Sequence, residues 1–287
     1  MLEFANSVDP LLVKAGGGAK DLEIREVKGK RGNYLIVHLL VDVRDAMGAN
    51  AVNTMCEKIS LKLEEITGGK HRLRILSNLA VHRTVQVSAI WNKEDLGGAE
   101  NIERILDAYD FAQHDAFRAC THNKGIMNGM SAVTVATGND WRALEAGAHA
   151  FAARNGNYTT LSWAEKTSEG NLKVSMEIPL AIGIVGGATK IHPLAQVSLK
   201  ILNVKTANEL AEIIASVGLA NNVAAVRALA MEGIQEGHMK LHARNLAMSV
   251  GAQGKEIEKI AEKMIQQKQV RMDTAQELLK EIRKNKK

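Results

Sequence analysis

The chain has 287 residues, enough for one large domain or two smaller ones with a substantial hydrophobic core. Hydrophobic residues make up 46% of it and charged residues 24%, a balance that excludes a disordered or fibrous protein. The net charge of +5 lies mainly in the tail, in Arg283, Lys284, Lys286 and Lys287, and aromatic residues are only 3%, so we expect no nucleic-acid partner.

Residues 1–77 have the pattern of a small α+β unit. A run rich in Val, Ile and Leu predicts a strand at 34–43, and a second short strand is expected at 72–76. Between them, residues 46–66 place apolar side chains on one stripe, which predicts a helix that ends at Gly68. We expect these strands to pair around one or two helices.

Helices predominate in the rest of the chain. Alternating apolar residues predict strands at 83–91 and 172–185. Helical periodicity and capping residues predict helices at 100–119, 139–154, 207–217, 221–249 and from Asp273 into the basic tail. The sequence therefore predicts an α+β fold.

The two cysteines indicate a reducing environment. Cys56 and Cys120 are too few for a disulfide framework and lack metal-ligand spacing, so we expect two reduced thiols, no metal site and a cytoplasmic protein. No uncharged apolar run approaches the length of a membrane span, and the first twenty residues lack the basic start of a signal peptide. We expect no membrane association.

A first polar and glycine-containing cluster runs from Asp42 to Asn50, at the junction of a predicted strand and helix. Small residues there would let a ligand approach the backbone, and the free N–H groups of a helix N-terminus suit an anion. The alternative is that Asp45 only caps the helix. Because the chain contains no Gly-x-Gly-x-x-Gly, a dinucleotide site here would differ from a standard Rossmann site.

A second cluster spans residues 118–129, where glycines predict a loop. Arg118, Lys124 and Asn128 could converge there on a carboxylate and a carbonyl oxygen, although a lone lysine in a loop is usually only solvated. A third cluster places Asp140 at a predicted helix start, where it would either cap the helix or hold a neighbouring cation.

A fourth cluster contains His238 and His242, four residues apart on one helical face. A zinc protease motif would need glutamate directly after the first histidine, and Met239 occupies that position. We therefore expect His238 to serve as a proton donor near neutral pH rather than as a metal ligand.

Five motifs carry a family resemblance. In chain order they are Asp45-Ala-Met-Gly-Ala-Asn50, Thr121-His-Asn-Lys-Gly-Ile-Met-Asn-Gly129, Gly138-Asn-Asp-Trp-Arg142, Gly186-Gly-Ala-Thr-Lys190 and Gly237-His-Met-Lys-Leu-His242. Together they resemble hydroxymethylglutaryl-CoA reductase of class II, the soluble bacterial and archaeal type, from about residue 1 to the end. Five separated motifs in one order make the resemblance specific.

The resemblance implies a four-electron reduction of 3-hydroxy-3-methylglutaryl-CoA to mevalonate and CoA, or the reverse, with two nicotinamide cofactors per turnover, in the mevalonate pathway of isoprenoid biosynthesis. Lys124 would polarise the thioester carbonyl, Asp140 would hydrogen-bond that lysine, and His238 would protonate the departing CoA thiolate. Arg118 and Asn128 would contact the substrate.

The resemblance also implies a cofactor site. Asp9 and Leu11 lie in a segment similar to the one that faces the adenosine ribose in this family. A carboxylate there would bind a 2′-hydroxyl and repel a 2′-phosphate, so we expect NADH to be preferred, with NADPH as the alternative. The remaining cofactor-binding residues would be Asp45, Met47, Gly48 and Asn50.

The implied architecture has three parts. A small antiparallel-sheet cofactor domain (1–77) is inserted in a mostly helical large domain (78–235), which carries the substrate residues, and a C-terminal helical flap (236–287) brings in His238. The family builds its site at a dimer interface, so we expect a homodimer or larger homo-oligomer. The family also requires a glutamate in an upstream motif that is absent from these residues, and we expect an N-terminal region to be lacking.

Three alternatives stay open at this point. Without the upstream glutamate, the chain would be a catalytically incomplete fragment that binds CoA or dimerises without turnover, since losing a general acid costs about two to four orders of magnitude in rate. It could also be another acyl-CoA or nicotinamide-dependent reductase. A nucleic-acid role for the basic tail is the third alternative.

Overall fold

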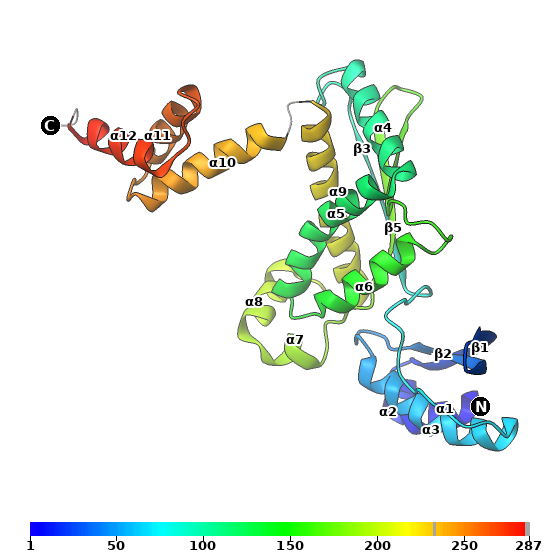
Figure 1. Ribbon diagram of the computed structural model, residues 1–287. Coiled ribbons are helices and arrows are strands. Elements are labelled where there is room, and N and C mark those ends of the chain that lie inside the picture. Colours follow the sequence, from blue (N-terminus) through cyan, green and yellow to red (C-terminus); the bar gives the residue numbers. More distant parts are fainter. Residues whose placement is uncertain (232–233, 285–287) are drawn as a thin grey trace. The chain divides into compact units, whose positions relative to one another are not determined.

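In the computed structural model, residues 1–231 and 234–284 are described, although only the backbone is described for 234–238, 240 and 241. The chain divides into two compact units (Figure 1). The first comprises Met1–Trp91 and Tyr109–Asn222, and the second comprises Asn92–Ala108 and Val223–Lys287. Helices and small antiparallel sheets form an α+β fold, which confirms the predicted class. The predicted three-part division of the chain stays a prediction.

The first unit begins with two helices packed on a long hairpin. The elements are α1 (Leu2–Val8), α2 (Pro10–Lys14), β1 (Gly18–Gly29), β2 (Gly32–Asp42) and α3 (Ala49–Thr67). β1 and β2 are antiparallel, and Ala5, Ala19 and Ile59 form a small core between the hairpin, α1 and α3. The predicted strand at 34–43 and helix at 46–66 are thus confirmed. β1 has no counterpart in the sequence predictions, because its charged residues obscure the apolar alternation.

The predicted strand at 72–76 was wrong. That segment is described and forms no strand, and its Leu73 and Ile75 are exposed. Side chains of α3 accept hydrogen bonds from its backbone instead, since Asn53 Oδ1 accepts from Leu76 N at 2.8 Å. An amide that already has a side-chain acceptor does not require a strand partner.

A three-stranded antiparallel sheet is the second sheet of this unit. It contains β3 (Thr84–Trp91), β4 (Ser162–Lys166) and β5 (Leu172–Pro179), in the order β3-β5-β4. β5 lies in the centre, with Leu172, Val174, Met176 and Ile178 fully buried. The predicted strand at 172–185 ends at Pro179, and the chain beyond it hydrogen-bonds to Asp45, through Ile184 N to the Asp45 carbonyl at 2.9 Å.

The remaining helices named here are α4 (Ala99–His114), α5 (Ala116–Ala136), α6 (Trp141–Ala152), α7 (Gly187–Ile191), α8 (Pro193–Leu202) and α9 (Ala207–Ala230). The predicted helix at 100–119 is in fact two helices, because Asp115 is extended and its carboxylate caps α5 through Arg118 N at 2.7 Å. The predicted loop at 118–129 was also wrong, since this segment lies inside α5.

The glycines of α5 bring it close to α9 rather than ending it. A Cβ on Gly129 would lie 2.9 Å from the Val217 carbonyl oxygen, and a Cβ on Gly218 would lie 2.5 Å from Met130 Cγ. Asn221 also donates to the Gly125 carbonyl at 2.7 Å. The same crossing explains why α9 continues past Gly218, where the sequence predicted a break.

A buried polar network joins α5 to β4, α4 and α9. His122 Nε2 lies 2.7 Å from Ser162 Oγ, while Tyr109 OH donates to Asn222 Oδ1 at 2.8 Å. Asn222 Nδ2 donates to the His122 carbonyl at 3.4 Å. All four side chains are buried. Burial, with the nearby Arg118 cation, lowers the pKa of His122 to about 4, so the ring is neutral near pH 7.

By length and composition α9 is a candidate membrane span, the one such helix within the described residues. Leu210 and Ile214 are nevertheless fully buried, and Asn222 is hydrogen-bonded inside the fold. Core helices of globular proteins meet the same criterion, so this helix is weak evidence for a membrane.

The second unit contains its own small core. Three of its helices are α10 (Ile234–Ser249), α11 (Lys255–Gln266) and α12 (Met272–Lys284), and Ala247, Ile260, Met264 and Leu279 are buried among them. The predicted final helix is confirmed as α12. The predicted helix at 221–249 corresponds to the end of α9 and to α10, which are separate elements.

Candidate functional site

Four segments distant in sequence surround one cleft of about 620 Å³ in the first unit. The lining residues come from 8–9, 46–54, 138–140 and 183–189. Two of the four sequence clusters, the Gly186–Lys190 motif and the predicted ribose-facing residue Asp9 therefore meet at one place. A cleft of this volume is large enough for a cofactor-sized ligand.

The N-terminus of α3 opens on the cleft without a side-chain cap. Its N-cap is Gly48, with φ of 94°, and Gly48, Ala49, Asn50 and Ala51 all line the cleft. A Cβ on Gly48 would lie 2.4 Å from Val43 Cγ1, so glycine is required for both conformation and space. The first N–H groups of α3 thus face a site where an anion would be stabilised.

Two carboxylates on opposite segments line the same cleft. Asp9 caps α2, accepting from Leu12 N at 2.9 Å through Oδ1. Asp140 caps α6 through its own Oδ1, which accepts from Arg142 N at 3.0 Å and Ala143 N at 3.1 Å. Each cap uses one oxygen, which leaves the Oδ2 atoms for a ligand. The capping predicted for Asp140 is confirmed, and it coexists with a position in the cleft.

Asp45 and Leu11 lie outside the cleft lining, and their roles in cofactor binding stay predictions. Asp45 is absent from the residues described as lining the cleft, and its Oδ1 accepts from Ala207 N at 2.8 Å. It therefore binds the first N–H of α9, beside the capping residue Thr206, and does not cap α3, the helix it precedes. Leu11 is 79% exposed and is also outside the lining. Met47, Gly48 and Asn50 lie in the lining, and their contacts with a cofactor also stay a prediction.

A side-chain hydrogen bond and a close backbone approach hold the walls of the cleft together. Asn139 Oδ1 accepts from Gly183 N at 2.8 Å, which joins the 138–140 segment to the 183–189 segment. A Cβ on Gly183 would lie 2.4 Å from Met47 N, so glycine permits the close approach of the two chains. The sequence did not identify Gly183 or Arg83 as site residues, because both contact backbone atoms of distant segments. The Arg83 guanidinium donates to carbonyls of both walls.

The predicted substrate residues lie on α5, outside the cleft lining. Lys124 and Asn128 are exposed and one turn apart, on one face of the helix, whereas Arg118 is half-buried. Twelve residues of α5 separate Lys124 from its end at Ala136, a rise of about 18 Å. Because Asp140 lies beyond that end, the predicted Lys124–Asp140 hydrogen bond is not formed within one chain. His238 is predicted as the acid, and its side chain lies outside the described residues.

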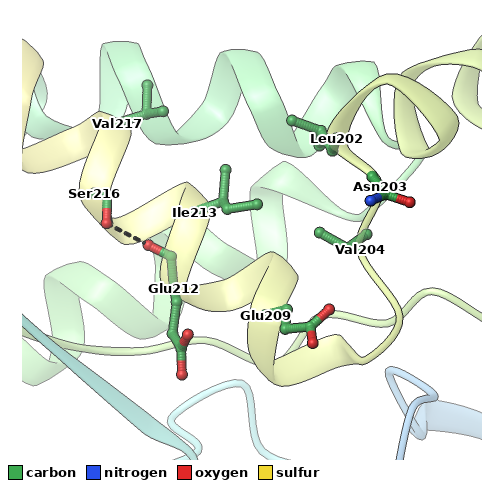
Figure 2. Close-up of a pocket in the computed structure, with 8 residues that line it drawn as sticks. All are labelled: Leu202, Asn203, Val204, Glu209, Glu212, Ile213, Ser216 and Val217. Atoms are coloured by element: carbon green, nitrogen blue, oxygen red, sulfur yellow. Dashed lines mark hydrogen bonds between the residues drawn. The ribbon is translucent and has the colours of Figure 1, made fainter.

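A second hollow of about 460 Å³ lies between the end of α8 and α9 (Figure 2). Its lining residues are Leu202, Asn203, Val204, Glu209, Glu212, Ile213, Ser216 and Val217. Figure 2 shows Ser216 bonded to the backbone oxygen of Glu212, at 2.7 Å. No predicted site residue lies in this groove.

The described residues contain no cluster of three or more His, Cys, Asp and Glu side chains that could hold a metal ion. Cys56 is half-buried and Cys120 is exposed, and both are free thiols. Burial raises the pKa of Cys56, with a contribution from Glu57, so this thiol is a poor nucleophile near neutral pH.

Comparison with known proteins gives the family. The family model described as hydroxymethylglutaryl-coenzyme A reductase matches residues 1–243. A 3-hydroxy-3-methylglutaryl-coenzyme A reductase of Archaeoglobus fulgidus is 56% identical over 283 residues, 99% of this chain and 65% of that protein. A probable reductase of the same name in Borreliella burgdorferi is 37% identical over 83% of this chain and 57% of its own length.

A solved structure indicates the same family. A class II 3-hydroxy-3-methylglutaryl-CoA reductase from Streptococcus pneumoniae, bound to NADPH in open conformations, has a TM-score of 0.79 and 44% identity over 98% of this chain and 69% of its own. The chain therefore belongs to the hydroxymethylglutaryl-CoA reductase family, which confirms the sequence resemblance. It spans 65% of the length of the Archaeoglobus relative.

Proposed function

We propose that this chain carries the cofactor cleft and the substrate-polarising lysine of a 3-hydroxy-3-methylglutaryl-CoA reductase. The proposed reaction is the reduction of the CoA thioester to mevalonate and CoA, or its reverse, in the cytoplasm. One observation supports it most: the cleft gathers Asp9, the uncapped start of α3 and Asp140 from three distant segments.

A dinucleotide fits the donor set of this cleft. The pyrophosphate would lie at the N-terminus of α3, against the N–H groups of Ala49 and Asn50. Asp9, which also lines the cleft, would accept from a ribose hydroxyl and repel a 2′-phosphate, which supports NADH as the preferred cofactor. The Streptococcus pneumoniae relative binds NADPH, so NADPH is the competing candidate. When bound, the reduced nicotinamide would supply hydride.

The proposed substrate residues follow the family motifs. Lys124 would donate to the thioester oxygen and stabilise the negative charge that develops there. Asp140 would accept from the lysine ammonium and keep it oriented and protonated. Arg118 and Asn128 would hold the acyl group, and His238 would give a proton to the leaving CoA thiolate.

The geometry of one chain requires a partner for this chemistry. About 18 Å of helix separates Lys124 from the segment that holds Asp140, which exceeds the reach of a lysine side chain. We propose that two copies pair so that Lys124 of one copy enters the cleft of the other. An apolar face on α8 is available for pairing, since Leu194 is 69% and Ile201 is 77% exposed.

Reductase activity is tested by following oxidation of reduced nicotinamide with 3-hydroxy-3-methylglutaryl-CoA as the only acceptor. The chain is assayed alone and mixed with an upstream fragment that contains the family's glutamate motif. Turnover in the mixture supports the proposal. Binding of CoA by calorimetry with no turnover in either assay would instead establish the non-catalytic fragment, and equal activity with other acyl-CoA thioesters would indicate a different reductase.

A further inference from the structure

The guanidinium of Arg83 lies outside the cleft lining and contacts four backbone carbonyls of the segments around it. Its Nη1 donates to the oxygens of Ala46 and Met47, at 3.1 and 3.4 Å. Its Nη2 donates to the oxygens of Ile182 and Arg44, at 2.6 and 3.5 Å. Arginine is suited to this position because its planar fork presents five N–H donors in fixed directions.

Three of these carbonyls belong to the turn that leads into α3. Arg44 has φ of 53°, a left-handed conformation that costs free energy in a residue with a side chain, and Gly48 has φ of 94°. The carbonyls of 44, 46 and 47 do not enter helix or strand pairing, so their hydrogen bonds come from water or from another donor in the fold. Arg83 supplies that donor, and it therefore stabilises a strained turn whose residues 46–48 line the cleft.

The fourth carbonyl belongs to the opposite wall. Ile182 immediately precedes Gly183, which approaches Met47 closely, and Ile184 N donates to the Asp45 carbonyl at 2.9 Å. Arg83 is itself anchored in the sheet, because its carbonyl accepts from Leu180 N at 2.9 Å. One half-buried side chain thus fixes both cleft walls relative to the sheet. Burial lowers the pKa of Arg83 while Asp42 and Asp45 oppose that shift, which indicates two carboxylates near the cation.

We propose that Arg83 is a positioning residue for the cofactor: it sets the separation of the turn at 44–48 and the segment at 182–185, and so determines how tightly the cleft binds an adenine dinucleotide. This inference rests on the proposed function, because it assigns the dinucleotide to this cleft. Arg83 itself is not part of the cleft lining, and we assign it no contact with the dinucleotide.

The test uses two variants and a matched control in the full chain. Arg83→Ala removes all four hydrogen bonds, and Arg83→Lys keeps the charge without the planar fork. Arg154→Lys is the control, since Arg154 also donates to a backbone carbonyl, that of Phe151 at 2.9 Å, but lies outside the cleft. The dissociation constant of NADH is measured by fluorescence titration, the thermal midpoint is recorded for each protein, and methylguanidinium is added below denaturing concentrations.

We expect Arg83→Ala to weaken NADH binding by about 10- to 100-fold, the range for losing hydrogen bonds to a charged group. Arg83→Lys is expected to show a smaller loss and Arg154→Lys none. Added methylguanidinium should restore binding to Arg83→Ala, since it can reoccupy the space between the carbonyls.

Three results would overturn the inference, and they differ from one another. Unchanged NADH affinity in Arg83→Ala, with normal binding by the parent chain, would remove the inference and leave the proposed function intact. If Arg83→Ala binds NADH more weakly, has a lower thermal midpoint and is not restored by methylguanidinium, the role of Arg83 is purely structural. Absence of dinucleotide binding by the parent chain would reject the proposed cofactor site, and the inference with it.

Discussion

Asp45 and Ala207 are joined by a hydrogen bond across 162 residues of sequence, with Asp45 Oδ1 accepting from Ala207 N at 2.8 Å. The Asp45 carboxylate, which directly precedes the cleft-lining residues 46–54, therefore binds the first N–H of the helix that crosses α5. The Asp45 carbonyl also accepts from Ile184 N, so this one residue connects the loop, the cleft wall and α9.

We expect Asp45→Ala to lower the free energy of unfolding by about 1–3 kcal/mol, the usual cost of leaving a partly buried N–H without its acceptor. Urea unfolding measures this change. The exposed Glu65→Ala on α3 is the matched control and should change stability little. A stability unchanged in Asp45→Ala would show that this hydrogen bond contributes nothing to α9.

The pH dependence of stability should report on His122. Its pKa is about 4 in the folded chain because of burial, and about 6.5 when unfolded, so the unfolded state binds more protons between these values. Stability is therefore expected to rise with pH through this window, by at most about 1.4 kcal/mol per pH unit, and to fall as the solution is acidified.

Denaturant titrations from pH 4 to pH 7 would test this expectation on the parent chain and on His122→Gln. The variant should lose most of the slope, whereas His82→Gln, which changes an exposed histidine, should keep it. An identical slope in the parent and in His122→Gln would assign the acid sensitivity to other groups.

Two glycines of α5, Gly129 and Gly125, allow a test of whether the close crossing of α5 and α9 requires glycine. We expect Gly129→Ala to destabilise the fold by about 1–3 kcal/mol, since its Cβ would lie 2.9 Å from the Val217 carbonyl oxygen. Gly125→Ala has only Asn222 Nδ2 at 3.9 Å and should gain about 0.5–1 kcal/mol from helix propensity. Thermal unfolding of both variants would check the opposite signs, and a shared sign would contradict this explanation of the glycines.

Cofactor choice is tested at Asp9. Asp9→Ser keeps a side chain that can cap α2 and removes the negative charge, so NADPH binding should improve relative to NADH. The ratio of the two dissociation constants measures the effect. Asp21→Ser, on β1 and outside the cleft lining, is the control. A ratio that moves equally in both variants would exclude a specific role for Asp9.

The sequence was most informative where hydrophobic periodicity is clear. β2, α3, β3 and α6 were predicted within a few residues, because β2 is a run rich in Val, Ile and Leu and the other three have regular apolar faces. α5 was misread as a loop, since its glycines serve a contact with a helix about ninety residues away and local sequence does not contain that partner. β1 was missed because half of its residues are charged, which obscures the apolar alternation, and because its stability depends on pairing with β2.

The candidate site, like the fold, was only partly predictable from the sequence. The segments at 46–50 and 138–140 were recognised as polar clusters, 186–189 was recognised as part of a family motif, and the three segments line one cleft. Their support by Arg83 and by the Asp45 carboxylate could not be predicted, because those side chains bind backbone atoms of distant segments. The Lys124–Asp140 contact was predicted from family motifs, and the straight helix between them prevents it in a single chain.

The central claim is that the amine of Lys124 meets the carboxylate of Asp140 between two copies of the chain. Zero-length carbodiimide cross-linking of an equal mixture of ¹⁴N- and ¹⁵N-labelled protein, followed by mass spectrometry of the linked peptides, tests it without requiring turnover. We predict a Lys124–Asp140 cross-link that contains one light and one heavy peptide. Links found only between peptides of the same isotope, or no link between these residues in a sample that forms other cross-links, would contradict the account.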